Sequence, residues 1–160
     1  MSSLAARIDF SQFKTLAPAA YAGMAAVTQA IHASGLEKDL GELLKIRASQ
    51  INGCAFCCQF HLTPARAAQV SQTKLDFVAV WQETPIFSAR ERAALAWTEA
   101  LTKIADAVPE ESVYAALQKE FSETEIAHLT AAIGLINAWN RIAAGLRFTP
   151  VIPAAVPTPS

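Results

Sequence analysis

The chain has 160 residues, of which 52% are hydrophobic and 17% are charged, and this length suits one domain that folds without a metal or disulfide staple. The 13 basic and 14 acidic side chains leave a formal net charge of -1, which offers no electrostatic argument for binding nucleic acid or an anionic membrane surface. Because an average protein is closer to about 25% charged, the composition indicates a large core or an oligomer that buries further helix faces.

The N-terminal end of the sequence does not resemble an export signal. Residues 1–10 include Arg7 and Asp9 and lack a long apolar stretch. No segment reaches the roughly 18 uninterrupted apolar residues of a transmembrane helix, because the longest candidate, 129–146, is broken by two asparagines and an arginine. We therefore expect a cytoplasmic protein without a membrane segment.

Three helices are predicted in the first half of the chain, where alanine is abundant and β-branched runs are short. The first covers 18–34, with a proline in its first turn and a Ser-Gly pair at its end. The second covers 36–51 and ends at an Asn-Gly pair. The third runs from about Cys54 to about Val70, and Pro64 is expected to kink or interrupt it.

Four helices are predicted in the second half. A short one covers 72–81, and a capping-box pattern beginning at Ser88 opens another that runs to about 105. The next covers 109–121. A second capping box at Ser122 opens the last helix, which runs to about 147 along a stripe of apolar residues.

The predicted fold class is all-α, because no segment shows the sustained alternation of a half-buried strand. We expect a bundle of about six to eight helices in a single domain over residues 1–149. Residues 150–160 hold four of the eight prolines and no charged side chain, which predicts an extended C-terminal arm.

All three cysteines lie between Cys54 and Cys58, so they do not form the distributed framework of a secreted protein. If Gly53 ends one helix and Cys54 begins the next, the pair lies at a helix N-terminus. The unpaired N–H groups and the helix dipole favour an anion there, and the anionic thiolate is the reactive form of cysteine.

Cys57 follows Cys54 by one turn, so the two thiols share a face and can form a disulfide. His61 follows Cys57 by four residues and neighbours it, where an imidazole can exchange a proton with a thiol. Cys57 is therefore the better candidate for the attacking residue and Cys54 for the resolving one. Cys58 points about 100° away from Cys57, which favours a core position, although it remains an alternative partner under oxidation.

Glu42 lies one helix earlier than the cysteine pair. If the Asn-Gly turn folds the two helices into a hairpin, a long Glu42 side chain can reach His61 and orient it, directly or through water. The competing interpretation is a surface charge paired with Lys38 or Lys45.

Purely structural roles remain open for the residues of the motif and for several others. The two paired cysteines and His61 could simply pack in the core. Zinc is disfavoured, because Cys54, Cys57, Cys58 and His61 would all lie on one helix and cannot surround a tetrahedral ion. Capping and inter-helix hydrogen bonds, or contact with a substrate, are expected of Arg47, Ser49, Gln50 and Asn52. Buried hydrogen bonds or a subunit interface are expected of Asn140 and Arg141. Core or interface positions are expected of Trp81, Trp97 and Trp139, and no role is assigned to His32 or His128.

The stretch from Glu42 to His61 resembles the signature of the alkylhydroperoxidase AhpD-like proteins, within the carboxymuconolactone decarboxylase superfamily. That signature is a glutamate, then C-x-x-C, then a histidine four residues after the second cysteine. The segment IRASQINGCAFC, residues 46–57, is close to the form of this signature that is common in the family. The resemblance extends to 88–105 and 121–146, and it covers most of residues 15–147.

The resemblance implies an all-α fold that assembles as a trimer or hexamer. It implies a peroxidase or disulfide reductase in which Cys57 attacks, Cys54 resolves, and Glu42 and His61 relay protons. The substrate is then a hydroperoxide or a disulfide, and the reductant an external dithiol of lipoyl or thioredoxin type. No cofactor is expected, since no nucleotide or flavin motif is present.

One position departs from some well-known members, which carry a second histidine inside C-x-x-C where this chain has Phe56. Two other functions stay open. The disulfide could control assembly without catalysis, or the chain could be a decarboxylase-like enzyme that does not use its cysteines.

Overall fold

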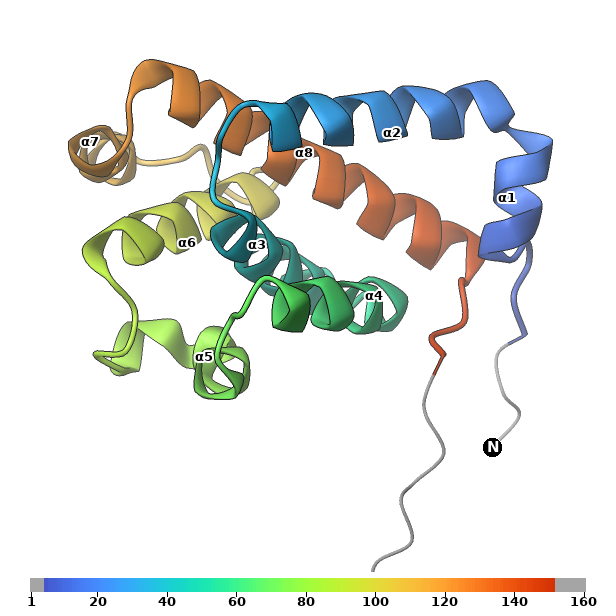
Figure 1. The fold of residues 1–160 in the computed structure, drawn as a ribbon, viewed down its shortest axis with the longest axis horizontal. Coiled ribbons are helices and arrows are strands. Elements are labelled where there is room, and N and C mark those ends of the chain that lie inside the picture. Colours follow the sequence, from blue (N-terminus) through green and yellow to red (C-terminus); the bar gives the residue numbers. More distant parts are fainter. Residues whose placement is uncertain (1–4, 152–160) are drawn as a thin grey trace, which may run out of the picture.

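The computed structural model describes residues 5–151, and in this range it contains eight α-helices, one 3₁₀ helix and no strand. The all-α prediction is therefore confirmed. Figure 1 shows their arrangement in chain order: α1 (Phe10–Leu16), α2 (Pro18–Ala33), α3 (Lys38–Ile51), α4 (Ala55–Ala67), α5 (Gln72–Phe77), η1 (Val78–Glu83), α6 (Ala89–Thr102), α7 (Glu111–Glu120) and α8 (Glu123–Leu146).

Most predicted helices are present, with shifted ends, and one helix was not predicted. Helix α1 was not predicted: it is a seven-residue helix without a buried residue that begins with a capping box between Asp9 and Gln12. The expected interruption at Pro64 is wrong, because α4 continues through it. The helix ends at Ala67 and not at Val70, since Gln69 has a left-handed backbone with φ of 66°.

Two further boundaries differ from the sequence prediction. The helix expected over 72–81 ends at Phe77 and continues as the 3₁₀ helix η1, where Val80 leaves helical geometry. The helix expected to run to 105 ends at Thr102. Of the predicted C-terminal arm, only Pro150 and Val151 belong to the described residues, and the remainder lies outside them.

Helix α3 is the centre of the bundle. It contacts α4, α6 and α8, and it contributes Leu40, Leu43, Leu44 and Ile46 to the main core. Helix α4 runs back along α3, while α2 lies along α8 on the opposite side (Figure 1). Trp81 and Trp97 belong to this main core, as the sequence suggested.

A second, smaller core surrounds the cysteine pair. Its buried members come from α3, the start of α4, the second half of α8 and the segment that follows α8: Ala48, Cys54, Cys57, Ile136, Ala143 and Phe148. Half-buried aromatic side chains from α1, α4 and α8 pack against it. The candidate redox residues thus lie where distant parts of the chain meet.

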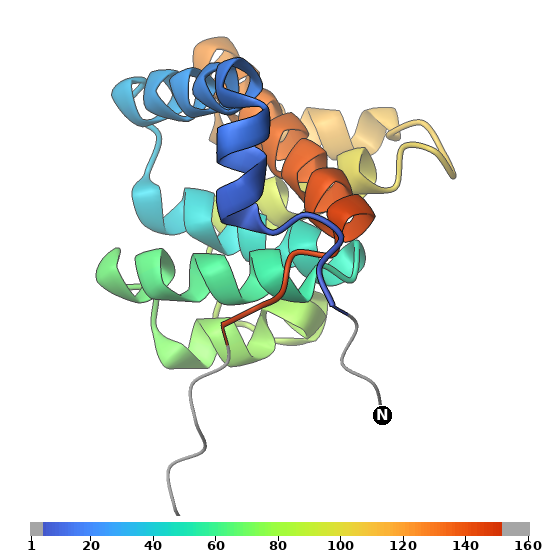
Figure 2. The same ribbon diagram turned by 90° about the vertical axis from the view of Figure 1, so that its right-hand side faces the viewer.

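The two ends of the described chain lie beside each other next to this smaller core (Figure 2). The backbone N–H groups of Arg7 and Ile8 both donate to the carbonyl of Leu146, at 2.9 and 3.4 Å. The Arg7 guanidinium also donates to the carbonyl of Gly145 at 3.0 Å. These bonds fix α1 against the end of α8.

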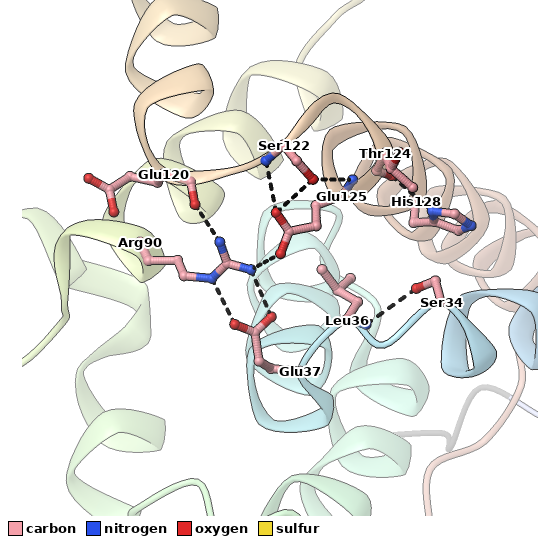
Figure 3. A network of polar contacts seen from close by, with 9 residues as sticks. All are labelled: Ser34, Leu36, Glu37, Arg90, Glu120, Ser122, Thr124, Glu125 and His128. Carbon is pink, nitrogen blue, oxygen red and sulfur yellow. Dashed lines mark hydrogen bonds and ion pairs between the residues drawn. The ribbon is translucent and has the colours of Figure 1, made fainter.

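A polar cluster around Arg90 joins four helix ends on the far side of the bundle (Figure 3). Its guanidinium donates to Glu37 Oε1 at 2.7 Å and to Glu125 Oε1 at 2.6 Å, and also to the carbonyl of Glu120. The guanidinium carbon lies 3.8 Å from the centroid of the Phe121 ring. Arg90 therefore ties together the starts of α3, α6 and α8 and the end of α7.

Among residues 5–151, none of the helices has both the length and the hydrophobicity of a membrane-spanning segment.

Candidate active site

The turn between α3 and α4 places the cysteine pair at a helix N-terminus, as predicted. Gly53 has φ of 64°, a left-handed conformation that glycine adopts without strain. Cys54 is the N-cap of α4, and its backbone N–H donates to the carbonyl of Ser49 at 2.9 Å. Cys54 and Cys57 consequently both lie where the unpaired amides of the first turn favour negative charge.

A buried network of side chains holds this turn against α8. The Asn52 amide donates to Asn137 Oδ1 at 2.9 Å and to Asn140 Oδ1 at 2.8 Å. Asn140 in turn donates to Ser49 Oγ at 3.0 Å. Ser49, Asn52 and Asn140 therefore have the structural role that the sequence favoured, and they fix the position of Cys54.

The remaining polar residues of α3 also take structural positions. Arg47 binds the carboxylate of Glu99 in α6, with its Nε at 2.8 Å from Oε1. Glu99 accepts a further hydrogen bond from the Trp81 indole at 2.8 Å. The Oε1 atom of Gln50 is buried and has no hydrogen-bond partner among the described residues.

Cys54 and Cys57 form a disulfide, with their Cα atoms 5.3 Å apart. Both residues are 4% exposed. Cys57 lines a cavity, and Cys54 is not among the residues that line it. The difference supports unequal roles for the two sulfur atoms, since a substrate in the cavity meets only Cys57.

Glu42 contacts His61 and one of the two lysines that the sequence left open, and it is not the surface charge of the competing interpretation. Its Oε2 lies 2.8 Å from His61 Nδ1, and its Oε1 lies 2.6 Å from Lys45 Nζ. Glu42 is only 7% exposed. Burial raises the pKa of its carboxyl, but the hydrogen bond with His61 and the charge of Lys45 outweigh burial and leave that pKa below its usual value. Glu42 is thus an ionised, buried link between two basic side chains.

The cavity next to Cys57 has a volume of about 290 Å³ and lies between α1, α2, α3, α4 and α8. His61 and Lys45 line it together with Cys57, and no aspartate or glutamate does. Most of its wall is apolar, and the aromatic part comes from four helices: Phe10, Tyr21, Phe56, Phe60 and Trp139.

Phe56, the residue inside the cysteine motif, is part of an aromatic cluster. Its ring centroid lies 5.5 Å from that of Phe10, 5.9 Å from that of Phe60 and 5.2 Å from that of Phe148. A histidine in this position would have to bury a polar ring among these phenylalanines. The phenylalanine that replaces the histidine of some family members therefore lies in an apolar environment. Phe56 lines the cavity and provides no proton donor.

Several cavity residues were missed by the sequence analysis. His32, which was given no role, lies on the cavity wall from α2, and Lys45 was considered only as a salt-bridge partner. Phe10 and Trp139 come from opposite ends of the chain. Aromatic residues near position 10 were the available signal, but only a fold shows that they meet Cys57.

Cys58 is a free, half-buried thiol that does not line the cavity. Burial raises its pKa, which leaves less of the reactive thiolate near neutral pH. Within residues 5–151 there is no group of three or more histidine, cysteine, aspartate or glutamate side chains arranged to hold a metal ion.

Comparison with known proteins agrees with this geometry. Residues 18–100, which include the whole motif from Glu42 to His61, match the model of the carboxymuconolactone decarboxylase family. The chain belongs to this family. The resemblance seen in the sequence is thereby confirmed. The chain is also similar to the uncharacterized protein YdfG of Bacillus subtilis, with 34% identity over 109 residues, which are 68% of this chain and 74% of YdfG.

Solved structures place this family member among AhpD-like folds. ATU0492 of Agrobacterium tumefaciens, a protein of unknown function named as a candidate antioxidant defence protein AhpD, is 38% identical, with a TM-score of 0.87 over 92% of this chain and 99% of ATU0492. The debrominase Bmp8 has a TM-score of 0.76 over 84% of this chain and 72% of its own, at 21% identity. The likeness to Bmp8 concerns the fold alone.

Proposed function

We propose that this member of the carboxymuconolactone decarboxylase family is a thiol-dependent oxidoreductase that reduces an organic hydroperoxide through Cys54 and Cys57. The observation that carries the proposal is the joint position of Cys57 and His61 on one apolar cavity. Cys57 is already paired with Cys54, and the buried carboxylate of Glu42 holds Nδ1 of His61 at 2.8 Å. An attacking group and an oriented base thus line one cavity, and the resolving group lies directly behind the attacking one.

The contact with Glu42 determines what His61 can do. When the neutral imidazole donates its Nδ1–H to the carboxylate, Nε2 carries no proton and can accept one. In the reduced protein, His61 accepts the Cys57 proton, and the thiolate attacks the terminal oxygen of the hydroperoxide. The O–O bond breaks, the leaving alkoxide takes the proton from His61 and departs as an alcohol, and Cys57 becomes a sulfenic acid.

Cys54 completes the cycle. Its sulfur attacks the Cys57 sulfur, the S–O bond breaks, and the oxygen leaves as water with the Cys54 proton. The sum is one hydroperoxide and two thiols converted to one alcohol, one water and the disulfide. An external dithiol, such as a lipoyl or thioredoxin-like group, then reduces the disulfide by thiol exchange.

The test is consumption of cumene hydroperoxide with dithiothreitol as reductant. We expect Cys57→Ser and Cys54→Ser each to lose turnover by at least about 100-fold, because covalent catalysis needs both sulfurs. Cys58→Ser is the matched control and should retain wild-type turnover. In Cys54→Ser, one equivalent of peroxide should leave a sulfenic acid on Cys57 that dimedone traps and mass spectrometry locates. Full turnover by Cys57→Ser would contradict the proposal.

A second candidate is reductive removal of a halogen from an aromatic ring. The specific observation in its favour is the aromatic wall beside Cys57, and Bmp8 is a debrominase that has been solved with 2,3,4-tribromopyrrole. The balance is one bromoarene and two thiols converted to one arene, bromide, a proton and the disulfide. Bromide release from that pyrrole, with no peroxide consumption, would favour this reaction over the first.

Two further outcomes identify the functions that the sequence left open. Turnover of a lactone or carboxylated substrate by both serine variants would indicate a decarboxylase-like enzyme. No turnover, but a reversible change of oligomer size on oxidation, would indicate a redox-responsive assembly.

A further inference from the structure

Lys45 is a charged side chain that the proposed redox cycle does not use, although it lies inside the site. It follows Glu42 by one turn of α3, and its Nζ is 2.6 Å from Glu42 Oε1. Its side chain is 15% exposed. It lines the same cavity as Cys57 and His61. Lys45 and His61 contact different oxygens of the Glu42 carboxylate.

Glu42 divides its two oxygens between these basic groups. Oε1 contacts Lys45 and Oε2 contacts His61, while Glu42 itself is buried and is not among the residues that line the cavity. A buried carboxylate without a compensating charge is costly. It would also oppose the formation of a second negative charge nearby, and the reaction requires such a charge on Cys57.

We propose that Lys45 is a positioning residue for the Cys57 thiolate: its ammonium group neutralises the buried Glu42 carboxylate, which lets Glu42 orient His61 without opposing the ionisation of Cys57. The inference deepens the proposed redox function and rests on it. It concerns the reduced protein, in which Cys57 carries the negative charge.

No other residue that lines the cavity supplies a second lysine or arginine, and Lys14, whose Nζ lies 4.9 Å from the Phe10 ring centroid and 6.0 Å from that of Tyr21, is not among the lining residues. Helix α4 presents Cys57 and His61, and α2 presents Tyr21 and His32. The parts of α1 and α8 that line the cavity carry no charged side chain. Lys45 is therefore the one lysine or arginine among the lining residues, and its charge and that of the Glu42 carboxylate sum to zero.

Removing the ammonium group of Lys45 should raise the pKa of the Cys57 thiol whether or not Glu42 stays ionised. If Glu42 stays ionised, its uncompensated charge opposes the thiolate. If Glu42 takes a proton, it no longer holds Nδ1–H of His61 as a carboxylate acceptor, and the imidazole loses its orientation toward Cys57. In both cases Cys57 ionises at higher pH than in the wild-type protein.

The experiment measures the alkylation rate of Cys57 by iodoacetamide across pH. It uses the full-length reduced protein with Cys54→Ser and Cys58→Ser, so that Cys57 is the remaining thiol. We expect Lys45→Met to move the midpoint of the rate profile upward by about one pH unit. Lys45→Arg, which keeps the charge, should stay within a few tenths of a unit of the parent. A merely structural lysine would lower stability in Lys45→Met without moving the midpoint.

Two results would overturn the inference: a Lys45→Met midpoint equal to that of the parent, or a Lys45→Arg midpoint that moves as far as that of Lys45→Met. If thermal unfolding shows that Lys45→Met does not fold, Lys45→Gln replaces it, because glutamine removes the charge and retains a hydrogen-bond donor for Glu42. Alkylation needs no peroxide, so the readout is separate from turnover. If Lys45→Met shifts the midpoint but the wild-type protein shows no peroxidase turnover, the role of Lys45 stands and the proposed peroxidase function is excluded.

Discussion

At the scale of single residues, the site depends on the carboxylate of Glu42, which does not itself line the cavity. Glu42 acts through His61 and Lys45, each of which reaches the cavity wall. Groups that orient a catalytic side chain from behind commonly contribute about 10–100-fold to activity when they are probed by mutation. The same magnitude is expected here.

Glu42→Gln tests this expectation. The amide keeps the shape of the side chain but loses the negative charge that orients His61, so kcat/KM for cumene hydroperoxide should fall by about 10–100-fold. Asp39→Asn is a matched control, because Asp39 is an exposed carboxylate at the start of the same helix. An unchanged kcat/KM in Glu42→Gln would exclude a relay through this residue.

The sequence predicted the residues of the site that share one short stretch of chain. Helical spacing alone brings Cys54, Cys57 and His61 together, and the hairpin turn adds Glu42. Tyr21, His32 and Trp139 could not be predicted in the same way, because they reach the cavity through the packing of α2 on α8 and of α8 on α4. Local spacing therefore indicates the chemistry, while the shape of the substrate space depends on tertiary contacts.

At the scale of elements, α1 and the Arg90 cluster show why local patterns miss what ties helices together. Helix α1 has no buried residue, and its local signals in the sequence, a capping box at Asp9 and two phenylalanines at helical spacing, do not show what the helix packs against. It is fixed by rings that pack on distant partners, since the Phe10 centroid lies 6.1 Å from that of Trp139 and 5.6 Å from that of Phe148. The capping boxes at Ser88 and Ser122, by contrast, are local and were predicted from four residues each.

Removing the Phe10 ring should loosen α1 without unfolding the bundle. In Phe10→Ala we expect faster amide hydrogen exchange in residues 10–16, while α3 and α8 keep their protection, because local opening follows local contacts. Thr15→Ala, an exposed position in the same helix, is the control. Hydrogen exchange with mass spectrometry makes the comparison, and equal protection of α1 in both variants would show that Phe10 does not hold it.

The Arg90 cluster predicts a pH-dependent contribution to stability. The backbone and side chain of Ser122, together with Arg90, lower the pKa of Glu125 to about 2, and Arg90 chiefly lowers the pKa of Glu37 despite partial burial. Carboxyl groups with a lowered folded-state pKa stabilise the fold above their unfolded pKa, and this contribution is lost as the pH falls through the folded value. The loss should therefore occur between about pH 4.5 and pH 2.

Arg90→Met should lower the free energy of unfolding by about 1–2 kcal/mol at pH 7, since the ion pairs are partly exposed and the contact with Phe121 adds a cation–π term. Urea denaturation at pH 7 and pH 3 makes the measurement, and the difference from wild type should shrink at the lower pH. Lys119→Met, at an exposed position near the same helix ends, should change stability by less than about 0.5 kcal/mol. A pH-independent difference would refute the electrostatic origin.

At the scale of the whole molecule, α2 is unusual because it presents an apolar surface to solvent. Its sequence, PAAYAGMAAVTQAIHA, contains no lysine, arginine, aspartate or glutamate, and Ile31 is its one buried residue. Val27 is 41% exposed. The low charge of the chain and this helix support the expectation of a homo-oligomer, which stays a prediction as to both its existence and its number of subunits.

We expect the purified protein to be a trimer or hexamer at micromolar concentration and Val27→Lys to shift it toward smaller species, because a buried charge opposes association. Val108→Lys, at a loop position that is 81% exposed, is the control. Sedimentation velocity makes the measurement, and a monomeric wild-type protein would show that α2 is not an interface.

The meeting of the two chain ends beside the cysteine pair has a consequence for biosynthesis. The cysteines leave the ribosome early, but Trp139 and Phe148, which pack in the smaller core with Cys57, are added about 80 to 90 residues later. At a synthesis rate of about 5–20 residues per second, Cys54, Cys57 and Cys58 lack the side chains of α8 and the following segment that later pack around the cysteine pair for roughly 5 to 20 seconds. During that interval the contacts that bury Cys54 and Cys57 are incomplete, so only the helical spacing that puts these two thiols on one face favours their pairing over a disulfide with Cys58.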